Sequence, residues 1–158
     1  MKLNERCLLL LAGAVFSLSS FAWDKAEVKW VSKERPFFAD DGSIIRNMPQ
    51  MGEVQSVHCR LPAGKVIQAC RHKTVSQIWY VTAGSGEMWL KSPDGTESIT
   101  AINAGTALTV PLGYSFQFRN TAKDDLDIFI VNTSAWSGSG ELIPVGNYWA
   151  PSFPRALR

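Results

Sequence analysis

The sequence has few histidines and cysteines, the side chains that most often bind zinc and iron. Its 158 residues include two histidines and three cysteines, whereas zinc and iron sites take three or four such ligands. No Gly-x-Ser-x-Gly motif occurs, and no serine or cysteine is recognisably paired with histidine and aspartate. Gly84-Ser85-Gly86 lacks a following helical pattern, so it predicts a tight turn between strands. Nucleophilic catalysis and phosphate-loop binding are therefore disfavoured.

The chain also lacks an excess of charge of either sign. Charged residues make up 19% of it, and the net charge is +2. Nucleic-acid binding and attraction to an anionic membrane surface normally need a strong basic excess. We therefore expect neither nucleic acid nor, in the mature protein, a membrane as partner.

Long apolar runs are missing except near the start. Lys2 and Arg6 precede an apolar run from Cys7 to Leu18, and small residues up to Ala22 follow. This order is typical of a secretory signal peptide, and the run is shorter than the roughly 20 residues of a membrane-spanning helix. We expect cleavage after Ala22, a mature net charge near +1, and a periplasmic or secreted protein.

Helical periodicity is absent from the mature chain, while turn residues recur every eight to twelve positions. The pattern predicts an all-β sandwich or barrel in one domain. Ser92-Pro93-Asp94-Gly95 predicts a hairpin loop. Residues 23–35 are expected to form a short edge strand or an extended arm. We expect about ten strands, the others being Ser43–Met48, Val54–Leu61, Val66–His72, Ser76–Thr82, Glu87–Lys91, Thr96–Ile102, Thr106–Val110, Ser115–Arg119 and Leu126–Asn132.

The expected organisation has four parts. Residues 1–22 form the signal peptide, residues 23–42 an N-terminal arm, residues 43–133 the barrel, and residues 134–158 a C-terminal arm. The last part is rich in glycine, proline and aromatic residues. We expect its aromatic side chains to pack on the barrel and its last four or five residues to fray.

Two spacings suggest which barrel this is. In the first, Cys70-x-His72 is followed after four residues by Gln77 and after six more by Gly84. This resembles the first motif of the cupin superfamily, in which His-x-His, Glu and Gly stand at these places.

The second spacing lies over Gly105, Pro111, Gly113, Phe116 and Asn120. It is similar to the second cupin motif, which has histidine where Phe116 stands. The resemblance implies a cupin double-stranded β-helix, a jelly-roll barrel in a single domain. Residues 42–46, 58–64 and 116–120, with a Trp-Ser-Gly tail, also resemble a subgroup of short type 2 cupins likened to mannose-6-phosphate isomerase.

The resemblance further implies a metal site, which is degenerate here. In an active cupin three histidines and a glutamate bind a divalent metal, and the four positions are Cys70, His72, Gln77 and Phe116 in this chain. Gln77 offers only an amide oxygen, and Phe116 offers no ligand. We therefore expect no cofactor, although Cys70 and His72 are side chains that could still bind a divalent metal. His58 should face away from the barrel interior, because it alternates with Cys59 along one strand.

The two mature cysteines, Cys59 and Cys70, are both expected to face inward. They lie on strands joined by Pro62-Ala63-Gly64, and an exported protein can form disulfides. We expect a bridge between them, which would stabilise the fold by about 3 kcal/mol. The alternative is that both stay reduced and pack as small apolar side chains.

Strand alternation also predicts the lining of the barrel. Gln77, Trp79 and Val81 should point inward with Phe116 and Phe118, whereas Arg71, Lys73, Gln117 and Arg119 should point outward. Such a lining is apolar and uncharged, which disfavours a phosphate. The three aromatic side chains either bind a ligand or simply fill the barrel.

His72 has two interpretations of its own. It either orients a ligand together with Gln77, or it is a core histidine that is hydrogen-bonded to Gln77.

Three functions remain open. The first is a metal-free cupin that binds a small neutral or aromatic molecule through His72, Gln77, Trp79, Phe116 and Phe118. The second is an isomerase, lyase or oxygenase in which His72 is catalytic or part of an unusual metal site. The third is an interaction protein whose aromatic tail joins subunits. The resemblance also makes a homodimer an expectation.

Overall fold

The computed structural model describes residues 25–138 and 140–153. These residues form strands and a single 3₁₀ turn, η1 (Val31–Lys33). The predicted all-β, jelly-roll fold is confirmed. The predicted signal peptide at 1–22 and the predicted frayed end lie outside the described residues. The division of the chain into domains stays a prediction.

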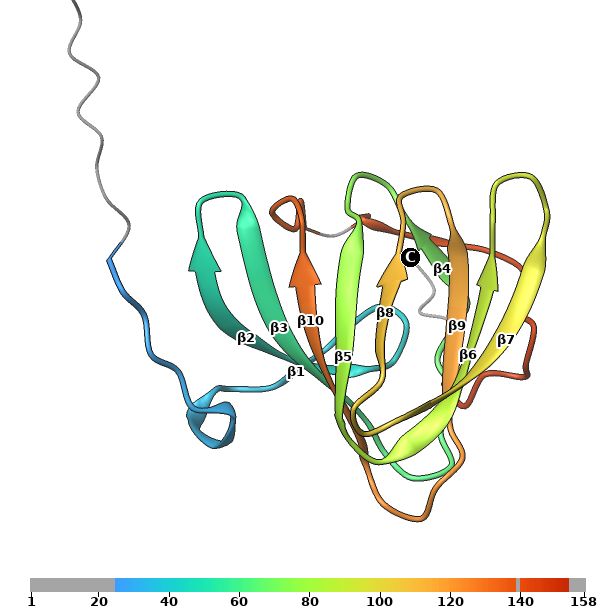
Figure 1. Cartoon of the computed structure of the whole chain (residues 1–158), viewed down its shortest axis with the longest axis horizontal. Helices are drawn as coiled ribbons and strands as arrows, with labels where there is room; N and C mark the ends of the chain where they lie inside the picture. Colours follow the sequence, from blue (N-terminus) through green and yellow to red (C-terminus); the bar gives the residue numbers. More distant parts are fainter. Residues whose placement is uncertain (1–24, 139, 154–158) are drawn as a thin grey trace, which may run out of the picture.

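Two antiparallel sheets face each other (Figure 1). The larger sheet has six strands, in the order β1 (Phe37–Phe38), β2 (Ile44–Met51), β3 (Val54–Leu61), β10 (Leu126–Asn132), β5 (Gln77–Ala83) and β8 (Ala107–Val110). The smaller sheet has five strands, in the order β11 (Leu142–Pro144), β4 (Cys70–His72), β9 (Ser115–Asn120), β6 (Ser85–Lys91) and β7 (Glu97–Asn103).

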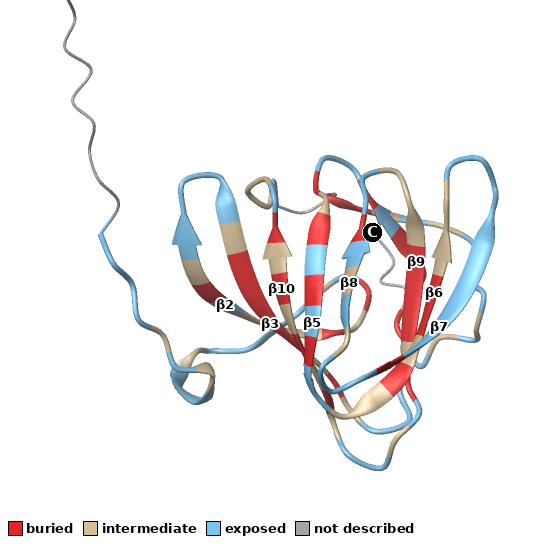
Figure 2. Ribbon diagram, viewed as in Figure 1, coloured by how far each residue is buried: buried red, intermediate tan, exposed pale blue. Residues whose placement is uncertain are grey.

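The core lies between the two sheets. Along β5 and β10 buried residues alternate with exposed or half-buried ones (Figure 2), as strands with one buried face require. The fully buried side chains include Leu61, Ile67, Val81, Leu126 and Ile128. The strands that flank the barrel interior are therefore fixed in register by their apolar faces.

The chain crosses from one sheet to the other at Gly84, between β5 and β6. Gly84 has φ of +79°, and a Cβ atom there would lie 2.4 Å from the backbone oxygen of Asp125. The expected tight turn at Gly84 and Gly86 is thus a sheet-to-sheet crossing and not a hairpin. The hairpin predicted around Ser92–Gly95 does form, between β6 and β7.

Of the predicted strands, β4 and β2 differ most from their expected bounds, the others by at most two residues at either end. β4 begins at Cys70 and not at Val66, because the backbone before it bonds to other segments: Ile67 N to Phe118 O and Gln68 N to Asp41 O. β2 continues through Pro49 to Met51. A register shift between Asn47 and Gln50 accommodates the proline, which has no N–H to donate.

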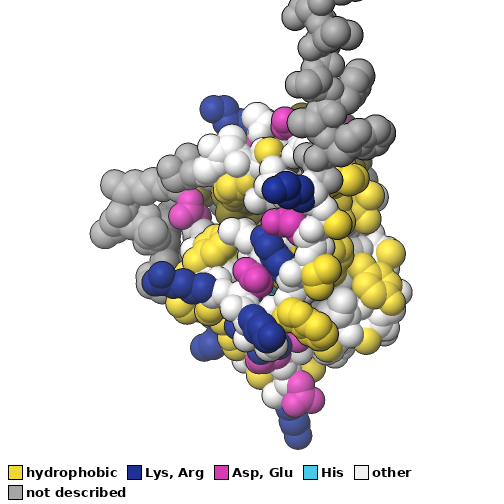
Figure 3. Space-filling model, turned by 90° about the vertical axis from the view of Figure 1, so that its left-hand side faces the viewer, with side chains coloured by type: hydrophobic (Ala, Val, Ile, Leu, Met, Phe, Trp, Pro, Cys, Tyr) yellow, Lys and Arg dark blue, Asp and Glu magenta, His cyan; other side chains and the backbone are white. Residues whose placement is uncertain are grey.

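The N-terminal segment from residue 25 runs beside β2 (Figure 1). Lys29 Nζ donates to Met48 O at 3.5 Å, and Gln50 N donates to Glu27 Oε2 at 3.2 Å. The segment contains η1 and pairs with β2 only through the short β1. On the β2 side of the molecule, Lys or Arg side chains alternate with Asp or Glu (Figure 3), so neither sign forms a patch there.

The C-terminal segment after β10 packs on the barrel, as predicted. Trp136 and Phe153 contact the core, and Tyr148 stacks on Trp89 with ring centroids 5.5 Å apart. The segment also contains a strand that the sequence pattern did not predict, β11, which pairs with β4. None of the helical structure in the described residues is long and apolar enough to cross a membrane.

Candidate functional site

A cavity of about 350 Å³ opens between the two sheets, so the barrel is not filled by its own side chains. Both sheets, the β1–β2 turn and the C-terminal segment contribute to it. Its lining comprises Phe37, Phe38, Ala39, Asp40, Asp41, Ser43, Ile45, Asn47, Gln55, Val57, Cys59, His72, Gln77, Trp79, Phe116, Phe118, Ile130, Asn132, Trp136, Gly138 and Leu142.

All five side chains predicted to bind a ligand line this cavity: His72, Gln77, Trp79, Phe116 and Phe118. They come from β4 and β9 of one sheet and from β5 of the other. The cupin-like spacing and strand alternation together predicted their common direction. Val81, also expected inside, is buried in the core but is not part of the lining.

The aromatic rings of the lining pack on one another. His72 stacks on Phe116 with centroids 5.1 Å apart and meets Trp136 edge-on at 5.6 Å. Trp79 contacts Phe116 and Phe118 edge-to-face at 5.7 and 5.1 Å. Such contacts fix ring orientation, so the cavity has a rigid aromatic wall.

A chain of amides crosses the larger sheet beside these rings. Trp79 Nε1 donates to Gln77 Oε1 at 2.8 Å, and Gln77 Nε2 donates to Asn132 Oδ1 at 2.8 Å. Asn132 Nδ2 in turn donates to Gln55 Oε1 at 3.4 Å. Each amide is thus oriented by its neighbour, and Gln77 is held by Trp79 and Asn132.

His72 has a buried imidazole with no hydrogen bond. Its side chain is 2% exposed, and within the described residues neither Nδ1 nor Nε2 has a hydrogen-bond partner. The bond to Gln77 expected of a core histidine does not form with ordinary hydrogen-bond geometry, although the Gln77 amide lies close enough to affect the imidazole. Burial lowers the pKa of His72 and outweighs the nearby Gln77 amide and Glu141 carboxylate, which raise it. A neutral imidazole keeps one donor and one acceptor for a ligand.

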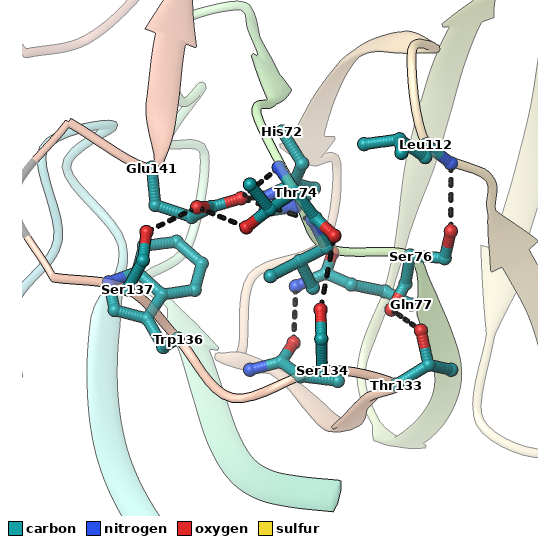
Figure 4. Close-up of polar contacts among 12 residues, drawn as sticks. His72, Thr74, Ser76, Gln77, Leu112, Thr133, Ser134, Trp136, Ser137 and Glu141 are labelled. Carbon is teal, nitrogen blue, oxygen red and sulfur yellow. Dashed lines mark hydrogen bonds and ion pairs between the residues drawn. The ribbon is translucent and has the colours of Figure 1, made fainter. Parts of the chain in front are cut away.

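Glu141 lies behind His72, with Oε1 4.0 Å from His72 Nδ1. Its carboxylate accepts hydrogen bonds from Thr74 N, Thr74 Oγ1, Val75 N and Ser137 Oγ, and Figure 4 shows it between Thr74 and Ser137. Burial raises the pKa of Glu141, but these hydrogen bonds outweigh it, so that the pKa is lowered. Glu141 is thus an ionised structural group that has no free oxygen for a ligand.

The side chains at the four motif positions do not fit a divalent metal. Gln77 is engaged on both sides, Phe116 has no donor atom, and burial followed by the charge of Asp41 raises the pKa of the Cys70 thiol well above its usual value. A thiol ligand must be deprotonated. Only His72 offers a free lone pair, and the described residues contain no group of three His, Cys, Asp or Glu able to hold a metal ion.

The expected disulfide between Cys59 and Cys70 is absent, and both buried cysteines are free. Cys59 lies on β3 of the larger sheet and Cys70 on β4 of the smaller one. The two cysteines are therefore not neighbours on adjacent strands of one sheet. The prediction failed because it placed the two strands side by side.

His58 faces away from the cavity, as predicted. Its Nε2 lies 3.3 Å from Asp127 Oδ1 on the outer face of β3 and β10. Gln117 also points outward as predicted, but it is fully buried. Its amide is covered by the C-terminal segment, where Tyr148 N and Trp149 N donate to Oε1.

Sequence reasoning missed several residues of the lining. Asn132 shares the inward face of β10 with Ile128 and Ile130, so a polar residue in an apolar alternation was the available signal. The sequence gives no such signal for Asp41, because Asp-Asp-Gly ordinarily indicates an exposed turn. Trp136 was expected to pack on the barrel, but nothing in the sequence placed it at the cavity.

Known proteins resemble this chain in sequence profile and in fold. The profile of the family described as Cupin matches residues 51–158, which is more than half of the chain. No curated protein sequence matches it.

Oxalate decarboxylases are among the solved structures that resemble this chain in fold. A mutant enzyme from Bacillus subtilis superimposes with a TM-score of 0.62 at 18% identity, covering 77% of this chain and 34% of the enzyme. The formate complex of the Lactobacillus farciminis enzyme gives 0.62 at 16% identity, covering 77% and 38%. This chain therefore spans about a third of the length of those enzymes, and the likeness extends to the fold alone.

Proposed function

Since the chain belongs to the cupin family, we propose that it binds a small neutral or aromatic molecule inside the barrel, without the metal usual in that family. The observation that carries the proposal is His72, a buried imidazole with two unpartnered nitrogens at the wall of an aromatic cavity. A buried polar group without a partner costs about 1–3 kcal/mol, and a ligand that bonds to it removes that cost.

The two histidines provide a matched experiment. Native mass spectrometry of protein purified without added ligand should detect a bound small molecule, which is lost in His72→Ala and retained in His58→Ala. His58 is also buried but lies outside the cavity, so its variant controls for general loss of stability. Equal loss from both variants, or none from either, contradicts the role of His72.

Metal analysis of the same protein tests the metal-free part of the proposal. We expect less than stoichiometric zinc, manganese, iron or nickel after gel filtration. One tightly held ion per chain would overturn this part. The proposal includes placement in the short type 2 subgroup with degenerate motifs, and Gln77 and Phe116 support the degenerate motifs.

An enzyme is the second candidate, because the neutral imidazole of His72 is free to accept or donate a proton. An isomerase or lyase would use it as acid and base. In that case the purified wild-type protein converts added substrate to product. His72→Ala abolishes this turnover while the protein stays folded. Unchanged turnover in the variant removes this candidate. The unusual metal site around His72 has no support from the donor set.

Export and oligomeric state belong to the same proposal. Mass spectrometry of the N-terminal peptide should find Trp23 as the first residue of the mature protein, and a chain that keeps Met1 in the periplasm contradicts cleavage.

The homodimer is supported by the exposed edge strands β7 and β8. Light scattering during gel filtration measures it, and a monomer at micromolar concentration contradicts it.

A further inference from the structure

The cavity wall includes a buried acid outside both cupin motifs, Asp41. It lies in the turn between β1 and β2 and is 6% exposed. Ser43 N and Ser43 Oγ both donate to Oδ1, at 2.8 and 2.6 Å, and Gln68 N holds the Asp41 backbone oxygen at 2.9 Å. The carboxyl group is thus fixed in place at the cavity wall.

No lysine or arginine belongs to the lining formed by the described residues. The ionisable side chains in it are Asp40, Asp41, Cys59 and His72. The charged groups are therefore acids, and the polar groups are otherwise amides, a hydroxyl and a neutral imidazole. A carboxylate or phosphate ligand would find no counter-charge here, whereas a cation would.

Aromatic rings surround the same space. Six of them line the cavity: Phe37, Phe38, Trp79, Phe116, Phe118 and Trp136. The faces of such rings attract cations, most strongly where water is excluded. Rings and a carboxyl group together are the chemistry that recognises organic ammonium groups.

Asp41 is also set up to change its charge when a cation arrives. Burial raises its pKa, the hydrogen bonds from Ser43 lower it, and the charge of Asp40 raises it, with a raised value as the result. The other ionisable groups that interact with it are the thiols of Cys59 and Cys70, whose own pKa values are raised by burial. An adjacent positive charge favours the ionised carboxylate.

We propose that the ligand is a small arylalkyl amine bound as its ammonium ion, with the nitrogen at Asp41 and the ring against the aromatic wall near His72. The inference rests on the proposed function and narrows its ligand class. His72 adds an acceptor nitrogen to the same cavity, and an ammonium group has up to three N–H donors to share between it and Asp41.

Three small molecules of similar shape test whether the ligand is bound as a cation. Benzylamine, benzyl alcohol and benzoate differ mainly in charge, and calorimetry with quenching of tryptophan fluorescence measures their binding to the mature protein. Benzylamine should bind at least about tenfold more tightly than either of the others. Equal affinity for the alcohol, or tighter binding of benzoate, overturns the amine while leaving the proposed function intact. Absence of binding by all three overturns both.

Asp41→Asn keeps the size of the side chain and removes its charge. It should abolish the preference for benzylamine over benzyl alcohol, whereas Asp94→Asn, in the exposed β6–β7 loop, should preserve it. If Asp41→Asn still prefers benzylamine, Asp41 is not the group that binds the ammonium nitrogen.

A second measurement needs no variant and guards against poor folding of Asp41→Asn. Benzyltrimethylammonium keeps its charge at every pH, so its affinity for the wild-type protein should fall as the pH is lowered and Asp41 takes up a proton. An affinity that is independent of pH, or that rises as the pH falls, contradicts the proposal.

Discussion

Asp127 is the most strongly bonded carboxylate on the outer face of the larger sheet. Arg60 Nε and Nη2 donate to its two oxygens at 2.7 and 2.8 Å, and His58 Nε2 lies at 3.3 Å. Burial raises the pKa of Asp127, but the contacts with His58 and Arg60 outweigh it and bring the pKa far below its ordinary value. The cross-strand pair is therefore partly buried and charge-assisted.

This pKa shift predicts acid sensitivity. Because the folded pKa lies below the unfolded value of about 3.9, the carboxylate stabilises the fold above that pH, and the contribution is lost as the pH falls through and below about 4. Asp127→Asn should lower the free energy of unfolding by about 1.5–3 kcal/mol at neutral pH and flatten its fall in acid. Urea unfolding at several pH values measures both effects.

The neighbouring Asp125→Asn is the control, since its longer contact with Arg60 at 3.4 Å is more exposed and should contribute less than about 1 kcal/mol. If the free energy of unfolding of Asp127→Asn falls in acid as steeply as that of the wild type, the prediction is contradicted.

Glu141 should be the more critical carboxylate. Glu141→Ala leaves Thr74 N and Val75 N without their acceptor in a buried site, so we expect a loss of about 3 kcal/mol or more. Glu141→Gln keeps an acceptor oxygen and should cost about 1–2 kcal/mol. Thermal unfolding compares them, and equal melting temperatures for the two variants would contradict this explanation.

At the scale of elements, the pairing of the start of β6 with β9 depends on a glycine for space. A Cβ atom on Gly86 would lie 2.1 Å from Arg119 O on the paired strand β9. Gly86→Ala should therefore destabilise the protein by about 3 kcal/mol or more. Gly146, in the C-terminal segment, has open space and no positive φ, so Gly146→Ala should change stability by less than about 1 kcal/mol. Chemical denaturation distinguishes them.

The strands and the inward direction of their side chains were predictable because both depend on local patterns. Val54–Leu61 and Leu126–Asn132 were predicted with the observed bounds, since alternation and turn residues define them. β11, the burial of Gln117 and the position of Asp41 were not predictable. They depend on where the C-terminal segment and the β1–β2 turn dock, which is decided by contacts between residues far apart in sequence.

At the scale of the whole molecule, the C-terminal segment is held on the barrel by Gln117. Its Nε2 donates to Ile67 O and Trp149 O at 2.8 and 2.9 Å, and its Oε1 accepts from two backbone N–H groups. Gln117→Ala should therefore release this segment and speed chymotryptic cleavage after Tyr148 or Trp149 by about tenfold or more.

Gln50→Ala, on exposed β2, is the matched control and should be cleaved at the wild-type rate. If both variants resist the protease equally, Gln117 does not anchor the segment.

Cys59 and Cys70, the free thiols of the described residues, can report how the barrel opens. Cys59 lines the cavity and Cys70 does not, although both are buried. A small uncharged alkylating reagent that enters the cavity therefore reaches Cys59 first, while Cys70 reacts only when the sheets separate. The ratio of the two labelling rates separates entry through the mouth from opening of the whole barrel. A bound ligand slows the first rate by occupancy and the second by stabilisation.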